Sequence, residues 1–349
     1  MVDRITSWFI KNVVIPRHEI IDNPGFVLMK PFTKGQYQIR QVVFPESLLI
    51  DLENEISAKY NQKGDQALYS LGKRFGYRMC HELRPPLKSE ISKKDFKKLS
   101  DFFVKFIECT YAHELKSELK LEDNEFDLLL DDFVICRKNG MGHILTEGGI
   151  AGVWSYVLED NSIEAIQNKC QGRGDSRCSL LCAPYEILKK RGLSPLSETD
   201  FKDLDVDSRY EVMNAINEPQ YSHNSFQDML DIKFFTYSGG MLMNNNQRYF
   251  LLDISLLYLI ESELTRLKGA EEVLFDCAFR HGKSISEAQG KNSYTFIPEY
   301  LSSCGWGDIL ITKNSTGKYE VTSVFFPWTK FAEKSKFVLF RGMVSGLLS

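Results

Sequence analysis

Two cysteines with the spacing of a metal-binding loop are the most chemically informative residues of this sequence. In Cys170-Gln-Gly-Arg-Gly-Asp-Ser-Arg-Cys178 the thiols lie eight positions apart, and Gly172 and Gly174 permit a tight turn that would bring both sulfurs to one ion. Zinc is the expected ion, because it prefers thiolate and imidazole ligands in a tetrahedral site. Cys182 fits less well, since in a strand its position would lie about 13 Å from that of Cys178.

The composition limits the kind of protein that carries this loop. The chain has 349 residues with 43 basic and 47 acidic side chains, a net charge of −4, so it is not a general nucleic-acid-binding protein. No segment approaches the roughly 18–20 apolar residues of a membrane span, and the start lacks the pattern of a secretory signal. We therefore expect a cytoplasmic protein that is not membrane-bound, in which crowded cysteines bind a metal rather than form disulfides.

An internal repeat organises the elements that must position the loop. Residues 47–56 read like residues 255–264, 208 positions later, and residues 68–76 read like residues 274–282, 206 positions later. All four segments have helical spacing, and strand-like sequence precedes the first helix of each copy. We expect the two copies to associate through equivalent faces about a pseudo-two-fold axis, with these helices in equivalent positions.

A third match places glycines on one face of a helix. The last eleven residues read like residues 145–155, so that Gly148 and Gly152 recur as Gly342 and Gly346. Glycine costs a helix interior about 1 kcal/mol against alanine, so packing must offset it. We expect Gly152 and Gly346 each to face a neighbouring element at short range and to wall a ligand pocket. The first copy continues past this helix into the cysteine loop, whereas the sequence stops at the matching helix of the second copy, so that either the second copy is naturally shortened or the sequence is a truncated one.

The repeat predicts an α+β fold of two tandem related domains, each an antiparallel sheet packed against helices. The predicted parts are an N-terminal amphipathic segment (1–24), a first domain with the zinc motif (25–190), a linker (191–230) and a second, incomplete domain without the motif (231–349). We expect the amphipathic segment to pack on the protein's own body or on a partner subunit.

Three segments of the chain resemble the 4-vinyl reductase domain family. They are the helix pattern of residues 68–76, the glycine-containing helix of residues 148–155, and the loop from Cys170 to Cys178, which is the most specific. The family includes the sensor domains of phenol- and toluene-responsive transcription activators, small archaeal proteins and, distantly, TRAPP vesicle-tethering subunits. The resemblance covers the first copy well and the second copy in part.

The resemblance implies a set of zinc ligands. In metal-binding members a cysteine begins the segment that leads into the glycine helix, and aligning on the glycines puts His143 at that position. Imidazole can replace thiolate at zinc, so the implied metal ligands are His143, Cys170 and Cys178. Phe337 aligns with His143 in the second copy, and we therefore expect one structural zinc per chain.

The fourth zinc ligand is left open by the resemblance. The family has a glutamate three residues before the first cysteine, and here that position is Gln167, whose neutral amide is a poor zinc ligand. Glu164, Glu147, Cys182 or a water molecule could fill the position.

The resemblance and the scarcity of enzyme motifs favour a non-catalytic function. The sequence has no Gly-x-Ser-x-Gly elbow and no His-Glu-x-x-His. The family implies a dimerising sensor that binds a small apolar ligand and acts as a homo-oligomer or through a protein partner. The alternatives are an assembly scaffold like the tethering subunits and an enzyme of tetrapyrrole or aromatic metabolism. A closed apolar pocket favours the sensor, exposed apolar patches the scaffold, and convergent groups with shifted pKa the enzyme.

Overall fold

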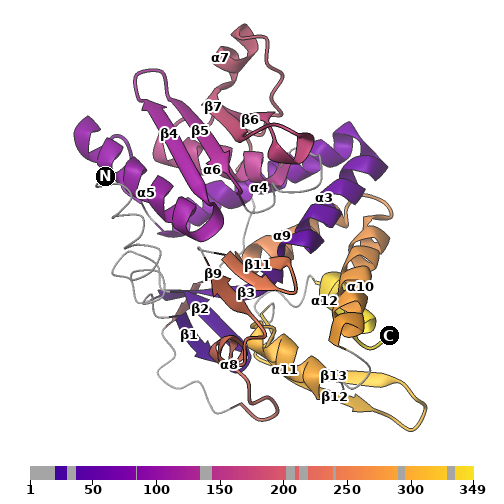
Figure 1. The fold of residues 1–349 in the computed structure, drawn as a ribbon. Helices are drawn as coiled ribbons and strands as arrows, with labels where there is room; N and C mark the ends of the chain where they lie inside the picture. Colours follow the sequence, from indigo (N-terminus) through magenta and orange to yellow (C-terminus); the bar gives the residue numbers. More distant parts are fainter. Residues whose placement is uncertain are drawn as a thin grey trace. The chain divides into compact units, whose positions relative to one another are not determined.

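The structure is a computed structural model in which the chain divides into two compact units (Figure 1). Among the described residues, unit 1 takes its members from Leu49–Asp205 and includes Met241, and unit 2 takes its members from His18–Leu48, Val206–Ser238 and Leu242–Ser349. No helix among the described residues has the length and apolar character needed to cross a bilayer. The described residues are 20–29, 37–83, 85–133, 144–201, 209–211, 219–238, 241–289, 295–327 and 335–349.

Unit 1 contains a four-stranded antiparallel sheet of order β4-β5-β7-β6, together with the helices that cover it. Its elements in chain order are α3 (Glu46–Tyr60, most of which belongs here), α4 (Gln62–Leu83), α5 (Lys93–Tyr111), β4 (Glu114–Lys120), β5 (Glu125–Asp131), α6 (Ile144–Val157), β6 (Ile163–Lys169), the short 3-10 helix η2 (Gln171–Arg173), β7 (Cys178–Pro184) and α7 (Tyr185–Lys190).

Alternating burial in β5 shows which face of this sheet is covered. Phe126, Leu128 and Leu130 are at most 4% exposed, whereas Leu129 between them is 44% exposed, as expected for a strand with one solvated face. On the covered side, Trp154 of α6 packs on Phe126 with ring centroids 4.0 Å apart. The core of unit 1 therefore lies between this sheet and α6.

Unit 2 contains a seven-stranded sheet of order β1-β2-β3-β11-β10-β9, with β8 also paired to β3, and a separate β12–β13 hairpin. Its elements in chain order are β1 (Ile20–Asn23), β2 (Phe26–Met29), β3 (Tyr37–Pro45), β8 (Arg209–Glu211), α8 (Phe226–Asp231), β9 (Thr236–Ser238), β10 (Met241–Asn244), β11 (Gln247–Asp253), α9 (Ile254–Leu264), α10 (Ala270–Gln289), α11 (Phe296–Ser303), β12 (Asp308–Lys313), β13 (Tyr319–Val324) and α12 (Val338–Leu347).

Strands from the two sequence copies meet in the large sheet of unit 2. β3 of the first copy pairs antiparallel with β11 of the second, and Phe44 lies opposite Phe250 in this pairing. Val42, Val43 and Phe44 are at most 1% exposed, because this apolar strand has neighbours on both edges and packing on both faces. The predicted α+β architecture with antiparallel sheets packed against helices is confirmed.

The order of elements repeats as the sequence predicts. Residues 47–56 lie in α3 and residues 255–264 in α9, and α4, β4, β5 and α6 recur as α10, β12, β13 and α12. The predicted close approach of the glycine helices is also confirmed. A Cβ atom at Gly152 would lie 2.7 Å from the backbone nitrogen of Tyr77, and one at Gly346 would lie 2.7 Å from that of Lys283, 206 positions further along.

Two buried glutamates hold the first turns of the glycine helices. In unit 1, the carboxylate of Glu53 accepts hydrogen bonds from the backbone nitrogens of Ile144 (2.9 Å) and Leu145 (3.2 Å). In unit 2, Glu261 accepts them from the backbone nitrogens of Lys336 (3.0 Å) and Leu339 (3.4 Å). The first N–H groups of a helix have no partner within the helix, so each glutamate satisfies donors that burial would otherwise leave unpaired.

The predicted linker contains a strand and a helix, and its residues are divided between the two units. Residues 209–211 form β8, and residues 226–231 form α8. Within unit 1 the chain after α7 crosses α4, where Gln66 donates a hydrogen bond to the Ser197 carbonyl and Tyr77 stacks on Phe201. The predicted domain boundaries stay a prediction, and the compact units group the strands differently because β1–β3 lie in unit 2.

Candidate functional site

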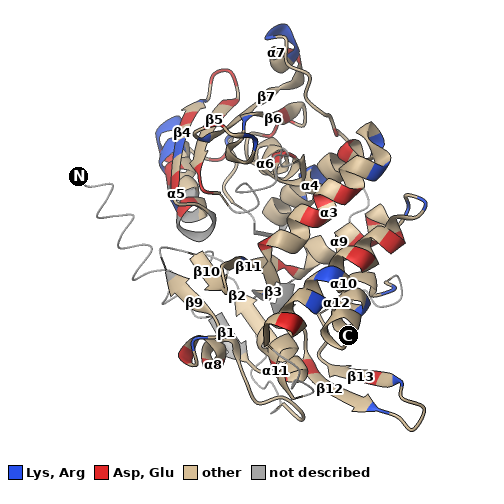
Figure 2. Ribbon diagram, turned by 45° about the vertical axis from the view of Figure 1, so that its right-hand side comes forward, with Lys and Arg blue, Asp and Glu red and all other residues tan. Residues whose placement is uncertain are grey.

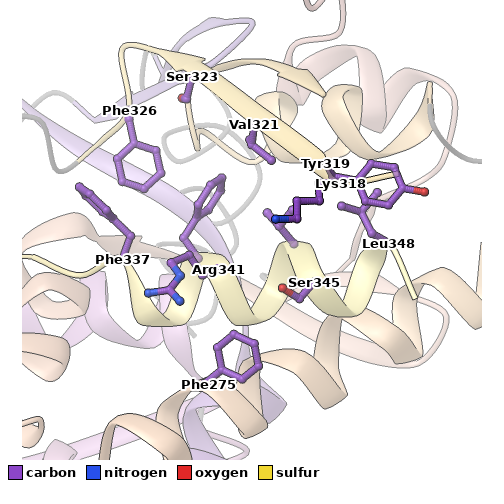
Figure 3. A pocket seen from close by; sticks show the side chains of 12 residues that line it. Phe275, Lys318, Tyr319, Val321, Ser323, Phe326, Phe337, Arg341, Ser345 and Leu348 are labelled. Carbon is purple, nitrogen blue, oxygen red and sulfur yellow. The ribbon is translucent and has the colours of Figure 1, made fainter. Parts of the chain in front are cut away.

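An open groove lies in unit 2 between the β12–β13 hairpin on one side and α12 on the other (Figure 3). Its volume is about 890 Å³, within the range of ligand-binding clefts. The lining residues come from α10, the hairpin and the region of α12, and they are Phe275, Lys318, Tyr319, Val321, Ser323, Phe326, Phe337, Phe340, Arg341, Val344, Ser345 and Leu348.

Aromatic side chains form one end of the groove. The Phe326 ring lies 4.8 Å from that of Phe340 and 5.2 Å from that of Phe337, and Trp306 packs behind Phe340 at 5.5 Å. Phe326 contacts the other two phenylalanines edge to face, and the Trp306 ring is tilted against Phe340, so these rings form an apolar surface at this end of the groove.

Alternate residues of β13 face the groove, because successive strand side chains point to opposite sides. Tyr319, Val321 and Ser323 line it, and Val321 is 37% exposed. The hairpin stands alone in its sheet, since in the described part of the chain β12 and β13 pair only with each other. One edge of β13 therefore has no strand beside it there.

Two basic residues place positive charge at separate parts of the groove lining. Lys318 precedes β13 and Arg341 lies on α12, and both are exposed. None of the lining residues that the structure describes is acidic. Figure 2 likewise shows basic residues on the hairpin. An occupant of the groove would thus gain from an apolar body and a negative charge.

The glycines of α12 face away from the groove. Gly342 and Gly346 meet the backbone of α10 at Phe275 and Phe279, whereas Arg341 and Ser345 line the groove. The expectation that Gly346 walls the pocket is therefore wrong for this groove. Close helix packing uses the glycine face, and the pocket forms on another face of the same helix.

In unit 1 the strand that corresponds to β13 is β5, and its inward-facing residues are buried. The β4–β5 hairpin of unit 1 corresponds to the β12–β13 hairpin of unit 2. When their inward-facing residues are aligned, β13 lies 193 residue numbers after β5, so that Leu128 corresponds to Val321. In unit 1, β7 pairs with β5, and Leu128 is 4% exposed. In unit 2 no described strand takes the place of β7, and the groove opens at that location.

The charges at the two basic positions are reversed between the copies. Lys318 corresponds to Glu125, whose carboxylate pairs with Lys120 at 2.7 Å and also with Arg191, just after α7. Arg341 corresponds to Glu147, which accepts a hydrogen bond from the backbone nitrogen of Gln167 at 2.8 Å. Burial raises the pKa of Glu147 to about 7, while the Gln167 hydrogen bond and the charge of Arg173 oppose the rise.

The cysteine loop of unit 1 makes the tight turn that the sequence predicts. Cys170 and Cys178 are both fully buried, and the backbone nitrogen of Gln171 donates a hydrogen bond to the Cys178 sulfur at 3.3 Å. Gly174 has φ +95°, a left-handed conformation that favours glycine. Asp175 closes the loop by accepting a hydrogen bond from the Cys170 backbone nitrogen at 2.8 Å.

The rest of the implied ligand set is not assembled among the described residues. His143 lies outside them, and within them no group of three or more histidine, cysteine or acidic side chains could hold a metal ion. Both oxygens of Glu164 already accept hydrogen bonds, from Tyr69 and from Ser197. Glu147 is half-buried on α6, and Cys182 is buried on β7. The zinc site therefore stays a prediction.

A buried ion pair is the main cluster of shifted titratable groups in unit 1. The Lys73 ammonium lies 2.9 Å from the Glu164 carboxylate, and both side chains are 0% exposed. The Tyr69 hydroxyl donates to Glu164 at 2.7 Å and accepts from the Ala165 backbone nitrogen. Burial raises the pKa of Glu164 and lowers that of Lys73, while their mutual attraction opposes both shifts.

This cluster has the character of a structural network. The chain after α7 covers it, with the Ser197 hydroxyl and the Glu198 backbone nitrogen donating to the outer oxygen of Glu164. The lysine also donates to the Asn161 carbonyl at 3.2 Å. A substrate could reach these groups only if the covering segment moved, so the arrangement satisfies buried charges rather than presenting them.

The groove between the β12–β13 hairpin and α12 was not predicted from the sequence. The signal was present, because at the distance of 194 positions that links α6 to α12, Glu147 is replaced by Arg341 and Trp154 by the smaller Leu348. Loss of a buried acid and of a large core ring at matched positions indicates that the second copy does not cover this face in the same way.

No family model and no curated protein matches the sequence, so the resemblance to the 4-vinyl reductase family stays a prediction. Solved structures that match include a trafficking protein particle complex subunit 3 from Naegleria fowleri covalently bound to palmitic acid, at 16% identity and TM-score 0.31, covering 40% of this chain and 93% of that one. They also include the phenol-responsive sensory domain of the transcription activator PoxR with phenol, at 15% identity and TM-score 0.31, covering 46% of this chain and 85% of that one. These values are too low to transfer a function or a ligand.

Proposed function

We propose that this chain is a non-catalytic binding protein whose binding site is the groove of unit 2. The single observation that carries this function is the lining of the groove. Its aromatic wall of Phe326, Phe337 and Phe340 lies in one groove with the two basic residues Lys318 and Arg341. The ligand class that fits has an apolar body and a negative charge.

The groove chemistry favours binding over catalysis. Its described lining offers apolar and aromatic side chains, two serines, one lysine and one arginine. General acid–base catalysis needs a group that exchanges protons near neutral pH beside a reacting atom, and this lining supplies no carboxylate, histidine or cysteine for that role. The clustered groups with shifted pKa lie instead in the covered network of unit 1.

Two kinds of ligand share this chemistry. One is the small apolar ligand that the sequence resemblance implies for a sensor. The other is a segment of a partner protein with acidic side chains, as an assembly scaffold would bind. Both would occupy the same groove, and binding of either supports the proposed function.

We also propose that unit 1 holds one structural zinc on His143, Cys170 and Cys178. What supports it is that both cysteines are buried at the two ends of a loop with a left-handed glycine, and that a backbone N–H donates to the sulfur of Cys178. Bound zinc would tie β7 to the segment before α6 and so stabilise the fold. The fourth ligand remains open among Glu147, Cys182 and water.

Titration with anilinonaphthalene sulfonate, a fluorescent aromatic anion, tests the groove. We expect one site per chain, and Arg341→Glu should weaken binding about tenfold, because a charge-assisted contact contributes on the order of 1.5–3 kcal/mol. Lys283→Glu is the matched control, since Lys283 is an exposed residue of α10 outside the groove lining.

The apolar part of the site is tested by a second pair of variants on β13. Val321→Asn should weaken dye binding, whereas Thr322→Asn should leave it unchanged, because Thr322 points to the opposite face of the strand. Equal dye affinity in Val321→Asn, Arg341→Glu and the unaltered protein would rule out the groove as the binding site.

A further inference from the structure

Residues 194–201 form a strap that crosses α4 without helix or strand structure and covers the Lys73–Glu164 ion pair. The Ser197 hydroxyl donates a hydrogen bond to Glu164 at 2.9 Å, and the Ser197 carbonyl accepts one from Gln66 of α4 at 2.8 Å. Beneath these contacts the side chains of Lys73 and Glu164 are 0% exposed. The strap is therefore part of what keeps the ion pair away from solvent.

The strap has one firmly held end. Just before it, the Leu193 backbone nitrogen donates to the Leu188 carbonyl at 3.1 Å, and the Leu193 side chain packs on a small apolar cluster of β7 and α7. Along the strap, by contrast, Ser197 and Thr199 are exposed. A segment with few buried apolar contacts opens at a lower free energy than the core does. The strap can therefore open while Leu193 stays in place.

The second copy packs the equivalent helices without a buried ion pair at this position. Lys73 of α4 corresponds to Phe279 of α10, 206 positions later. Both helices receive a glycine helix in the same way, since a Cβ atom at Gly152 would meet the Lys73 carbonyl and one at Gly346 would meet the Phe279 carbonyl. This helix packing does not need a lysine. Because apolar residues often replace a buried ion pair without loss of stability, stability alone does not account for Lys73.

We propose that the strap is a releasable cover, latched on Glu164, which opens without unfolding of unit 1 and exposes Lys73 and Glu164 to solvent. In the closed state the latch joins one carboxylate oxygen of Glu164 to two donors of the strap. These are the Ser197 hydroxyl at 2.9 Å and the Glu198 backbone nitrogen at 3.1 Å. Hydrogen bonds to a charged acceptor are stronger than neutral ones, so this pair of contacts holds the closed state.

An aromatic contact closes the far end of the strap. The Phe201 ring stacks on Tyr77 of α4 with centroids 4.0 Å apart, and the Lys73 ammonium lies 5.6 Å from the Phe201 centroid. Tyr77 also packs edge to face on Tyr156 of α6 at 5.3 Å, which holds its ring from the other side. The face uncovered by an open strap therefore carries a cation, an anion and an aromatic ring.

Acetylation of lysines in the full chain by an N-hydroxysuccinimide ester, followed by mass spectrometry, measures the opening. In the unaltered protein Lys73 should react far more slowly than Lys97, which is exposed on α5. Ser197→Ala should raise the rate at Lys73 about tenfold, because it removes a hydrogen bond to a charged acceptor. Thr199→Ala is the matched control on the strap and should leave this rate unchanged.

Hydrogen exchange of β5 distinguishes opening of the strap from unfolding of unit 1, because β5 is an inner strand paired with β4 and β7. Exchange in β5 should be the same in Ser197→Ala and in the unaltered protein. Phe201→Ala is a second variant, which removes the ring stacked on Tyr77 and should also speed acetylation of Lys73. An unchanged Lys73 rate in either variant, an equal rise in Thr199→Ala, or faster exchange in β5 that parallels the rise at Lys73 overturns the proposal.

Discussion

Val43 and Leu251 lie opposite each other where β3 pairs with β11, and they occupy the same position of the two sequence repeats, 208 residues apart. The pairing of β3 with β11 is therefore symmetric about the Val43–Leu251 pair. Phe44 faces Phe250 on one side of this pair, and Val42 faces Leu252 on the other. A self-complementary contact of this kind is the signature of a two-fold dimer interface, here formed within one chain. Within unit 2 these strands therefore meet through equivalent positions, and the association of the two copies through equivalent faces stays a prediction.

The glycine helices give the first prediction. Gly152→Ala should lower the free energy of unfolding by about 2–3 kcal/mol, because its methyl group would overlap the Lys73 carbonyl and lie 2.7 Å from the Tyr77 backbone nitrogen. Gly149→Ala is the matched control three residues away, where the nearest atom would be 3.8 Å off. It should be neutral or stabilising by up to about 1 kcal/mol. Denaturant unfolding followed by circular dichroism measures both, and equal effects would refute the packing role.

The repeat could be predicted from the sequence because it depends on local patterns. Helical spacing at residues 47–56 and glycines four apart at Gly148 and Gly152 are visible without a structure, and both are confirmed. Pairing of β3 with β11 is different, since it joins residues about 200 positions apart and no local pattern specifies which strand edge meets which. The sequence therefore predicts two copies, but not that strands of the first copy join the sheet of unit 2.

The candidate sites, too, could be predicted from the sequence only in part. The predicted turn at Cys170–Cys178 is confirmed, with Gly174 in the left-handed conformation and Gly172 within η2, whereas the third implied ligand, His143, lies outside the described residues. The groove lies beside β13, where no other described strand than β12 pairs with it. A residue pattern in the sequence does not show which strands pair with β13. Only comparison with the covered copy reveals it, through the change from Glu147 to Arg341.

Glu53 gives a prediction on pH dependence. Burial raises the pKa of Glu53 from 4.5 to about 8, although the backbone hydrogen bonds from Ile144 and Leu145 oppose the rise. A pKa higher in the folded state means that this group's contribution to stability is full below pH 4.5 and is lost as the pH rises to about 8. The limiting slope is about 1.4 kcal/mol per pH unit.

Glu53→Gln isolates this contribution, because glutamine does not titrate. The difference in free energy of unfolding between the unaltered protein and Glu53→Gln should fall from pH 5 to pH 8, and then stay constant. Urea unfolding at several pH values measures it. A difference that is flat or rises with pH would mean that Glu53 is ionised in the folded state and acts as an anionic cap of α6.

The buried ion pair gives a prediction on charge compensation. Lys73→Met should destabilise the protein by about 3–5 kcal/mol, because it leaves the Glu164 carboxylate buried without its cation. Adding Glu164→Gln should recover a large part of this loss, since no buried charge then remains. The loss in Lys73→Met should also shrink as the pH falls, because burial raises the pKa of Glu164 and so favours its protonation. Additive effects of the two substitutions in thermal unfolding would contradict the coupling.

Zinc content gives the last prediction. The purified full chain should contain one zinc, because the second copy has Phe337 where the first has His143. Cys170→Ser and Cys178→Ser should each release the metal and lower the melting temperature, since the ion would hold η2 and β7 together. Cys80→Ala is the matched control, because Cys80 is a buried free cysteine on α4 and is not among the candidate ligands. Elemental analysis and differential scanning calorimetry on the same samples separate the two effects. A protein without zinc, or with two zinc ions per chain, would refute the assignment, and so would a Cys170→Ser variant that keeps both metal and melting temperature.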